Sequence, residues 1–279
     1  MTTTADSVEL WSGKDRGDEN FPVGSLLIAP RVRKHVHAFY AFARNADDIA
    51  DSATLPAAAK VARLDAMEDV LLGRRGSGSP SATRLRASLE ESGVTPQHAC
   101  DLLTAFRRDA TQLRYRDWDD LLDYCRYSAM PVGRHVLDLH GELLEAWPAS
   151  DALCAALQVE NHLQDCARDL VTLDRCYLPA DLLAAHGARV EDVTAPATSA
   201  GLRRVFDALL DHCDALNRTG AELPRLIQDR HLRLETAVIV GLSRRLARRL
   251  RRGDPLAARV KLRKRDAAWA ILGALRFLR

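Results

Sequence analysis

Apolar residues recur along most of this 279-residue chain at the three- and four-residue spacing of an amphipathic α-helix. The spacing predicts helices over residues 30–51, 54–72, 95–112, 117–128, 150–171, 201–219, 222–229, 231–251 and 266–278. We expect Thr54, Asp117 and Ser150 to cap three of these helices, because their side-chain oxygens can accept a free amide hydrogen of the first turn. Loops are predicted at the Gly/Ser-rich segment 73–80 and at 191–200, and a break in the chain's helical path at 128–133, which contains Pro131 and Gly133.

The composition favours the same architecture. Leu and Ala together number 85, whereas the β-branched residues Val and Ile number 22. Short connections between many amphipathic helices indicate a single all-α bundle at residues 21–279, preceded by a loose arm at 1–20. No apolar run is long enough to span a membrane, the N-terminus is no secretory signal, and six scattered cysteines indicate reduced thiols, so we expect a cytoplasmic protein.

Charge is distributed unevenly along the chain. Residues 244–279 carry 13 Lys/Arg and two Asp/Glu, whereas residues 1–243 carry 27 and 36. The basic segment is either an ordinary solvated face or a surface that docks on anionic lipid, with the apolar side chains of the last helix at the interface: Trp269, Ile271, Leu272, Leu275 and Phe277. Nucleic acid is not expected as a partner, because no basic motif interleaved with aromatic residues occurs. The oligomeric state stays open.

One polar face of the first predicted helix carries two carboxylates a turn apart. His37, Tyr40, Arg44, Asp47 and Asp51 follow one another at spacings of three and four residues. Carboxylates at i,i+4 repel each other, at a cost of about 0.2–0.5 kcal/mol, so folding alone gains nothing from the pair. A divalent cation would turn that repulsion into chelation.

The helix predicted over 150–171 repeats the arrangement. Gln158, His162, Asp165 and Asp169 share one face, and again two carboxylates lie one turn apart. Oxygen ligands with few carboxylates per ion suit Mg²⁺, which shares phosphate oxygens of its substrate. A di-iron bundle is excluded, because no Glu-x-x-His pair occurs.

If the two faces oppose each other, they form an anionic cleft that can hold more than one Mg²⁺ and a diphosphate. Arg44 and Arg168 would then add charge-assisted contacts to the diphosphate. The alternative is that each acidic pair is a solvated helix face, and that each arginine neutralises its neighbouring aspartates.

These residues also carry a resemblance to the squalene/phytoene synthase family. Its first motif is similar to Tyr40-x-x-x-Arg44-x-x-Asp47-Asp48-x-x-Asp51, and its second to Asp165-x-x-Arg168-Asp169 followed by Tyr177-Leu178-Pro179. Three further segments resemble the hydroxysqualene synthase branch of hopanoid biosynthesis: 19–23, 124–133 and Asn161-His162-x-Gln164-Asp165. The chain departs from that branch at Met130, where Asn is usual, and at Asp174-Arg175, which replaces Gly-Arg.

The resemblance implies an isoprenoid-synthase helical fold around a central cavity. It implies Mg²⁺ ions bound by Asp47, Asp51, Asp165 and Asp169, with Tyr40 and Arg44 beside the substrate diphosphate. It also implies that substrate is contacted by Asp48, His162, Gln164 and Arg168, and by Asn20 and Ser25 of an N-terminal phosphate-contacting segment.

The function that this resemblance implies is ionisation of presqualene diphosphate and capture of the cation by water, giving hydroxysqualene and diphosphate without NADPH. The closest alternative is head-to-head condensation of two farnesyl diphosphates to presqualene diphosphate, squalene or phytoene. An alternative of another class is a non-catalytic lipid-binding or assembly protein on the same fold. The four intact carboxylates argue against that last function.

Overall fold

The computed structural model describes residues 7–9 and 29–278, and within them the chain is helical throughout its regular structure. Across these ranges no β-strand occurs, and a single isolated parallel bridge joins Arg114 to Cys176. The predicted all-α fold is therefore confirmed. The predicted N-terminal arm lies outside the described residues apart from 7–9, where the Glu9 carboxylate accepts hydrogen bonds from the hydroxyls of Ser79 and Ser81.

The helices follow one another with short connections. The α-helices are α1 Arg33–Ala50, α2 Ala57–Leu71, α3 Pro80–Ser92, α4 Gln97–Thr111, α5 Trp118–Ser128, α6 Met130–His140, α7 Trp147–Leu173, α8 Ala180–Ala185, α9 Ala200–Gly220, α10 Leu223–Leu226, α11 Arg230–Arg252 and α12 Lys264–Ala274. Single 3₁₀ turns are η3 Leu144–Ala146, η4 Val190–Thr194 and η5 Leu275–Phe277.

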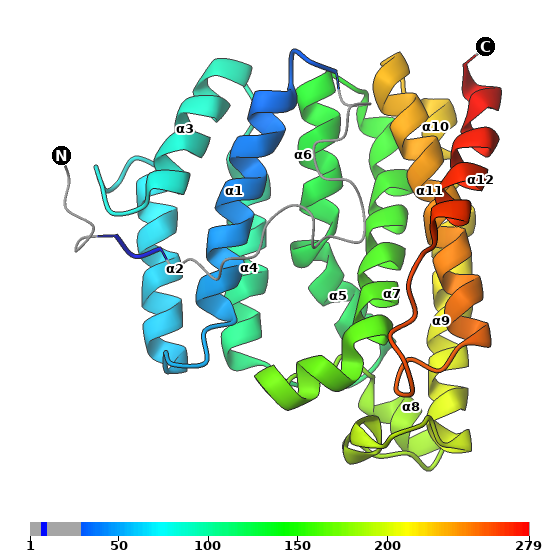
Figure 1. Ribbon diagram of the computed structural model, residues 1–279. Coiled ribbons are helices and arrows are strands. Elements are labelled where there is room, and N and C mark those ends of the chain that lie inside the picture. Colours follow the sequence, from blue (N-terminus) through cyan, green and yellow to red (C-terminus); the bar gives the residue numbers. More distant parts are fainter. Residues whose placement is uncertain (1–6, 10–28, 279) are drawn as a thin grey trace.

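The long helix α7 runs through the middle of the bundle, between two groups of helices (Figure 1). Helices α1 to α4 form one side, and α9, α11 and α12 form the other. Each side has its own apolar cluster, one built on Phe42 and Met67, the other on Phe206 and Leu246. This division leaves α1 and α7 facing each other where the two halves meet.

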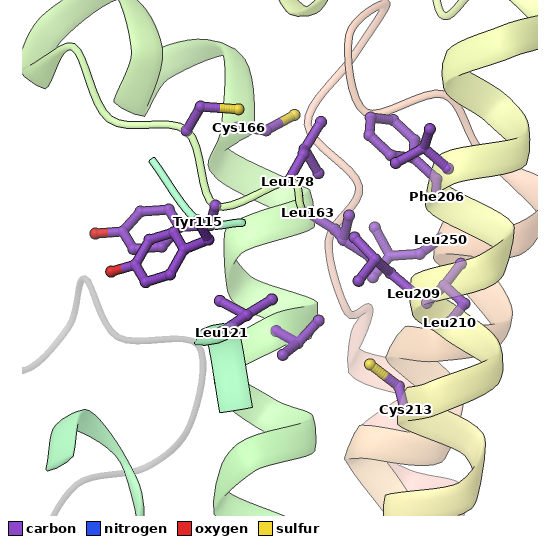
Figure 2. Packing of buried hydrophobic residues seen from close by; sticks show 14 of the residues in the cluster. Tyr115, Leu121, Leu163, Cys166, Leu178, Phe206, Leu209, Leu210, Cys213 and Leu250 are labelled. Carbon is purple, nitrogen blue, oxygen red and sulfur yellow. The ribbon is translucent and has the colours of Figure 1, made fainter. Parts of the chain in front are cut away.

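The larger cluster fills the space between α5, α7, α9 and α11 (Figure 2). Tyr115, Leu163, Leu178 and Leu210 are all buried in it, and so is the thiol of Cys213. All six cysteines are free, as predicted, and four of them are buried. None of the helices in the described ranges combines the length and the apolar character needed to cross a bilayer.

Two of the predicted helix N-caps are wrong, and three helices were not predicted. Helix α2 follows Pro56 with no side-chain cap, and the Thr54 hydroxyl pairs with Ser52 instead. Helix α7 begins at Trp147, with Pro at the start of its first turn, so Ser150 is an interior residue that packs against its neighbours. The cap at Asp117 is confirmed, because its carboxylate accepts the Asp120 amide hydrogen at 2.8 Å. The unpredicted helices are α3, α6 and α8.

The predicted break at 128–133 is confirmed, but it separates two helices rather than introducing a loop. Helix α5 ends at Ser128, and α6 starts two residues later with Pro131 in its first turn, where a missing amide hydrogen costs nothing. Gly133 then faces α7 so closely that a Cβ atom would lie 2.4 Å from Ser150 Oγ and 2.7 Å from Cys154 Sγ. This glycine therefore sets how closely α6 packs against α7.

A polar cluster is buried where α7, α9 and α11 meet. Asn217 donates to Glu160 Oε1 at 2.9 Å, and the Ser243 hydroxyl lies 2.9 Å from the same oxygen. Glu160 is completely buried, and its Oε2 has no hydrogen-bond partner among the described residues. Burial raises the pKa of Glu160 to about 8, although Asn217 and Ser243 favour the ionised form.

We expect this carboxyl group to make stability depend on pH. Its pKa is about 8 in the folded chain against an ordinary 4.5, so the folded state holds the proton more tightly. The contribution is complete below pH 4.5 and is lost as pH rises through 8, at up to about 1.4 kcal/mol per pH unit. Urea unfolding from pH 5 to 9 should show this slope in the wild type, and Glu160→Gln should remove it. An unchanged slope in the variant would contradict the assignment.

Candidate active site

A cavity of about 530 Å³ lies between α1 and α7, where the two halves of the bundle meet. Both predicted acidic faces line this one cavity, which confirms that they oppose each other. Its lining comprises Arg44, Asp47 and Asp51 of α1, Gln158, Asn161, His162, Asp165, Arg168, Asp169 and Leu173 of α7, Phe106 and Asp109 of α4, Tyr124 and Ser128 of α5, and Arg175, Tyr177 and Arg259 from segments between helices.

The α1 wall holds its aspartates with an arginine from the same helix. Arg44 lies 2.8 Å from an oxygen of Asp47 and 2.8 Å from one of Asp48, in the following turn. Asp47 and Asp51 are one turn apart on the cavity face. Asp48 lies outside the cavity lining, and its side chain is only 3% exposed. Asp48 therefore helps to orient Arg44 from the side of the helix.

The α7 wall repeats this construction. Arg168 lies 3.0 Å from Asp165 and 3.2 Å from Asp169, so one guanidinium bridges both carboxylates and offsets part of their charge. Burial nevertheless raises the pKa of Asp169 to about 6, against the opposing effect of Arg168, and the carboxylates of Asp165 and Asp51 contribute to the increase. The contribution of Asp51, on the α1 wall, to the raised pKa of Asp169 indicates that the two acidic walls interact electrostatically across the cavity.

Arg259 joins the site from far along the sequence. It belongs to the segment between α11 and α12, and its Nε and Nη2 atoms lie 2.9 Å from the two oxygens of Asp165. This paired geometry is the strongest arrangement of a guanidinium and a carboxylate. The amide of Gln164 donates to the Val260 carbonyl at 2.6 Å, which fixes the segment beside α7.

Arg175 crosses from the end of α7 to the end of α1. It donates to Asp51 at 2.6 Å and to the backbone carbonyls of Ala50 and Asp109 at 2.9 and 3.0 Å, and it is buried. The preceding residue, Asp174, has φ 53° at the C-terminus of α7, in the left-handed region. That conformation explains why glycine is usual at this place in the family that the sequence resembles, and Asp is among the residues that tolerate it.

A buried acidic group that sequence analysis missed lies beneath this arginine. Asp109 of α4 accepts hydrogen bonds from the hydroxyls of Tyr124 and Tyr177 at 3.0 and 3.2 Å. Burial raises the pKa of Asp109 to about 6, while Arg175 and both tyrosines act in the opposite direction. Asp109 continues the apolar stripe of α4 after Leu102 and Ala105, and a carboxylate in a stripe that faces the core is a signal that could have identified it.

Neutral polar groups line the cavity beside the α7 carboxylates. The His162 ring stacks on Tyr177, with centroids 3.5 Å apart and 11° between planes, and its Nε2 lies 3.2 Å from the Gln158 amide nitrogen. Burial, assisted by the nearby cation of Arg175, lowers the pKa of His162 to about 3. The imidazole is therefore neutral at physiological pH. Asn161 adds another uncharged group to this wall.

The other predicted substrate contacts are distributed as follows. Tyr40 is partly buried on α1 and does not line the described cavity, and neither does Gln164, which binds Val260 instead. Asn20 and Ser25 lie outside the described residues. The roles of these four residues in binding substrate stay predictions.

The donor set of the cavity fits Mg²⁺ accompanied by a substrate anion. Its four aspartates of α1 and α7 offer oxygen ligands, yet no cluster of three metal-ligating side chains occurs in the described part of the chain. Mg²⁺ commonly binds one or two carboxylates and takes its other ligands from water and phosphate. The lining also contains five aspartates against four arginines, so a bound diphosphate would need additional positive charge.

Residues 14–266 match the squalene/phytoene synthase family profile. A hydroxysqualene synthase from Rhodopseudomonas palustris is 50% identical over 267 residues, covering 96% of this chain and 91% of that protein. A hydroxysqualene synthase from Zymomonas mobilis is 44% identical, covering 92% and 87%. The crystal structure of squalene synthase HpnC from Alicyclobacillus acidocaldarius superimposes with a TM-score of 0.74 at 33% identity, covering 85% of this chain and 90% of that one.

The contacts of Arg175 predict a large loss of stability when its charge is removed. Arg175→Gln should lower the free energy of unfolding by about 3–5 kcal/mol, because Asp51 loses its buried ion-pair partner and the buried Asp109 carboxylate loses a nearby cation. Arg114→Gln is the matched control, since Arg114 pairs with Asp174 at the surface and should contribute at most about 1 kcal/mol. Urea unfolding measures both variants. Equal losses would contradict the role given to Arg175.

Proposed function

We propose that this chain, which belongs to the squalene/phytoene synthase family, ionises presqualene diphosphate and captures the resulting cation with water, giving hydroxysqualene and diphosphate. The observation that carries the proposal is the pair of carboxylate walls that share one arginine-rich cavity. The identity of 44–50% to three hydroxysqualene synthases supports this product over others of the family.

The first step is departure of the diphosphate. We assign Asp47, Asp51, Asp165 and Asp169 as the residues that would hold Mg²⁺, which when bound offsets the charge of the leaving diphosphate and so makes it a better leaving group. Arg44 and Arg168 already line the cavity and can donate charge-assisted hydrogen bonds to the diphosphate oxygens. Their fixed positions stabilise the charge that develops as the carbon–oxygen bond breaks.

The second step needs a positioned water rather than a strong base. A carbocation accepts the oxygen of a neutral water directly, and the proton that the new alcohol must lose can pass to solvent or to the released diphosphate. Gln158, Asn161 and His162 form an uncharged polar wall where a water can be held by hydrogen bonds. The neutral imidazole of His162, stacked on Tyr177, holds a fixed orientation there.

The alternative is the reaction of a condensing synthase, which joins two farnesyl diphosphates. It would use the same carboxylates, and the structural neighbour from Alicyclobacillus acidocaldarius is a squalene synthase. The two activities differ in substrate and in their need for a reductant, so product analysis separates them.

We expect presqualene diphosphate with Mg²⁺ in ¹⁸O-labelled water to give a labelled C30 alcohol, with and without NADPH. The label enters because water supplies the oxygen, and NADPH has no effect because no hydride is transferred. Mass spectrometry of the extracted products measures both. Unlabelled squalene that forms only with NADPH would reject the proposal and favour the condensing alternative, as would product from farnesyl diphosphate alone.

The metal assignment predicts that charge, rather than shape, is what the acidic walls contribute. Asp47→Asn and Asp169→Asn should each reduce turnover by at least about 100-fold, because each removes a ligand charge while keeping the side-chain volume. The free energy of unfolding should change by less than about 1 kcal/mol, since each change also relieves repulsion within its pair. Asp207→Asn, on the surface of α9, should leave turnover unchanged. Losses of stability and turnover in proportion would indicate a structural role.

A further inference from the structure

The outer face of the last helix exposes large apolar side chains. Trp269 is 61% exposed, and Ile271, Leu272, Leu275 and Leu278 are each about half exposed. Helix α12 packs on α11 through the opposite face, where Ala270 approaches Gly241 so closely that a Cβ atom there would lie 3.0 Å away. Figure 1 shows α12 at the edge of the bundle, with no helix outside it. Half of the ten exposed large apolar residues described in the chain lie in these final ten positions.

A basic groove runs beside this apolar face. It has a volume of about 620 Å³ between α9, α11 and α12, and Trp269 forms part of its wall with Arg244, Arg245, Arg248 and Arg276. A second groove of about 950 Å³ continues past Trp269 along the segment that joins α11 to α12. Its lining adds Arg249, Arg252, Arg259, Lys261, Arg263 and Arg265.

Most of this positive charge is not neutralised by the protein itself. Among the groove residues, Arg249 pairs with Asp266 and Arg259 pairs with Asp165. The neighbouring Arg251 pairs with Asp211 and Asp214. Across the described residues, however, Arg244 and Arg248 form no ion pair, although the Arg248 side chain donates to a backbone carbonyl. The acidic body of the protein therefore does not cover the basic surface, and an external anion is the complementary partner.

The basic surface adjoins the catalytic cavity. Arg259 lines both the cavity and the second groove, and it is the residue that binds Asp165. A single short segment thus separates the reaction site from the basic groove and the apolar face. The proposed product is a C30 alcohol, which partitions into a bilayer. This reason for membrane contact rests on the proposed function, whereas the charge and the exposure of the surface are independent of it.

We propose that α12 and the adjoining arginines of α11 form a docking surface for a bilayer that contains anionic lipid. The apolar stripe of Trp269, Leu272 and Leu275 enters the interface between headgroups and acyl chains, as in amphipathic helices that lie on membranes. Arg244, Arg245 and Arg248 bind lipid phosphates beside it.

A second copy of the chain is a poorer occupant of the same surface. A two-fold interface brings identical patches together, so it would place these unneutralised arginines against their own copies. A nucleic acid would satisfy the arginines but would leave the apolar stripe exposed to water. A bilayer satisfies both features at once.

The test is binding of the full-length protein to vesicles, without substrate, so that its outcome is independent of the reaction. We expect flotation with vesicles of phosphatidylcholine and phosphatidylglycerol, no flotation with phosphatidylcholine alone, and weakening by salt. Trp269 should enter the bilayer interface, so tryptophan fluorescence should shift to the blue on binding, and Trp269→Phe should abolish the shift.

Matched variants separate the two contributions. Arg244→Gln/Arg248→Gln should weaken binding by about 30-fold, at about fivefold per charge. Leu272→Ser/Leu275→Ser should remove the fluorescence shift and weaken the binding to anionic vesicles at low salt. One control is Arg75→Gln/Arg84→Gln, which changes exposed arginines just before and within α3, a helix on the opposite side of the bundle from α12 (Figure 1). The other is Leu143→Ser/Leu144→Ser, which changes two other exposed leucines. Circular dichroism checks that each variant is folded.

Several results would overturn the proposal. They are equal flotation with neutral vesicles, no flotation at all, or a fluorescence shift that survives in Trp269→Phe. A dimer in light scattering that Leu272→Ser/Leu275→Ser dissociates would assign the surface to a second copy. Binding to a DNA oligonucleotide with none to anionic vesicles would assign it to a polyanion.

Discussion

The site depends on keeping several carboxylates close together in a partly buried cavity. Asp47, Asp51, Asp165 and Asp169 repel one another, and burial adds to the cost, as the raised pKa of Asp169 shows. The fold offsets this cost with guanidinium groups that reach the cavity from separate parts of the chain. Arg44 and Arg168 come from the same helices as their partners, whereas Arg175 and Arg259 come from the segments that follow α7 and α11.

This difference in origin decides what the sequence could reveal. Pairs such as Arg44 with Asp47, or Arg168 with Asp169, follow from helical spacing, so the sequence predicts both walls and the cavity that they share. The contact between Arg259 and Asp165 joins residues 94 positions apart, and no local pattern encodes it. Arg175 was visible only through the family resemblance, as the arginine that follows Asp174 where Gly-Arg is usual, and Asp109 only as a charge within an apolar stripe. The two buried tyrosines that bind Asp109 come from different segments again.

The helices, like the site, could be predicted where local sequence patterns determine them and not where contacts with a neighbouring helix do. Long helices with a clear apolar stripe, α1, α9 and α11, begin and end within three residues of their predicted bounds. Helix α6 escaped prediction because Pro131 and Gly133 are residues that usually interrupt helices. Proline is harmless in a first turn, and Gly133 is required by the close approach of α7, but both facts become visible only once the neighbouring helix is in place. Ser150 resembled a cap because its position inside α7, close against Gly133, likewise becomes visible only in the folded chain.

The net charge of +2 is the sum of an acidic region and a basic region that lie on different parts of the protein. The cavity lining carries five aspartates and four arginines, whereas the charged residues that line the grooves beside α12 are mainly arginine and lysine. Arg259 lines both regions, so an anion attracted to the basic surface would lie next to the cavity. Inside the cavity, a metal ion or a guanidinium group would have to offset the negative charge of the aspartates before the anion could bind. By its position, the positive surface would raise the local concentration of an anion beside the cavity without neutralising the carboxylates of α1 and α7. Mixing the two sets of charges throughout the surface would have given the same net charge and neither effect.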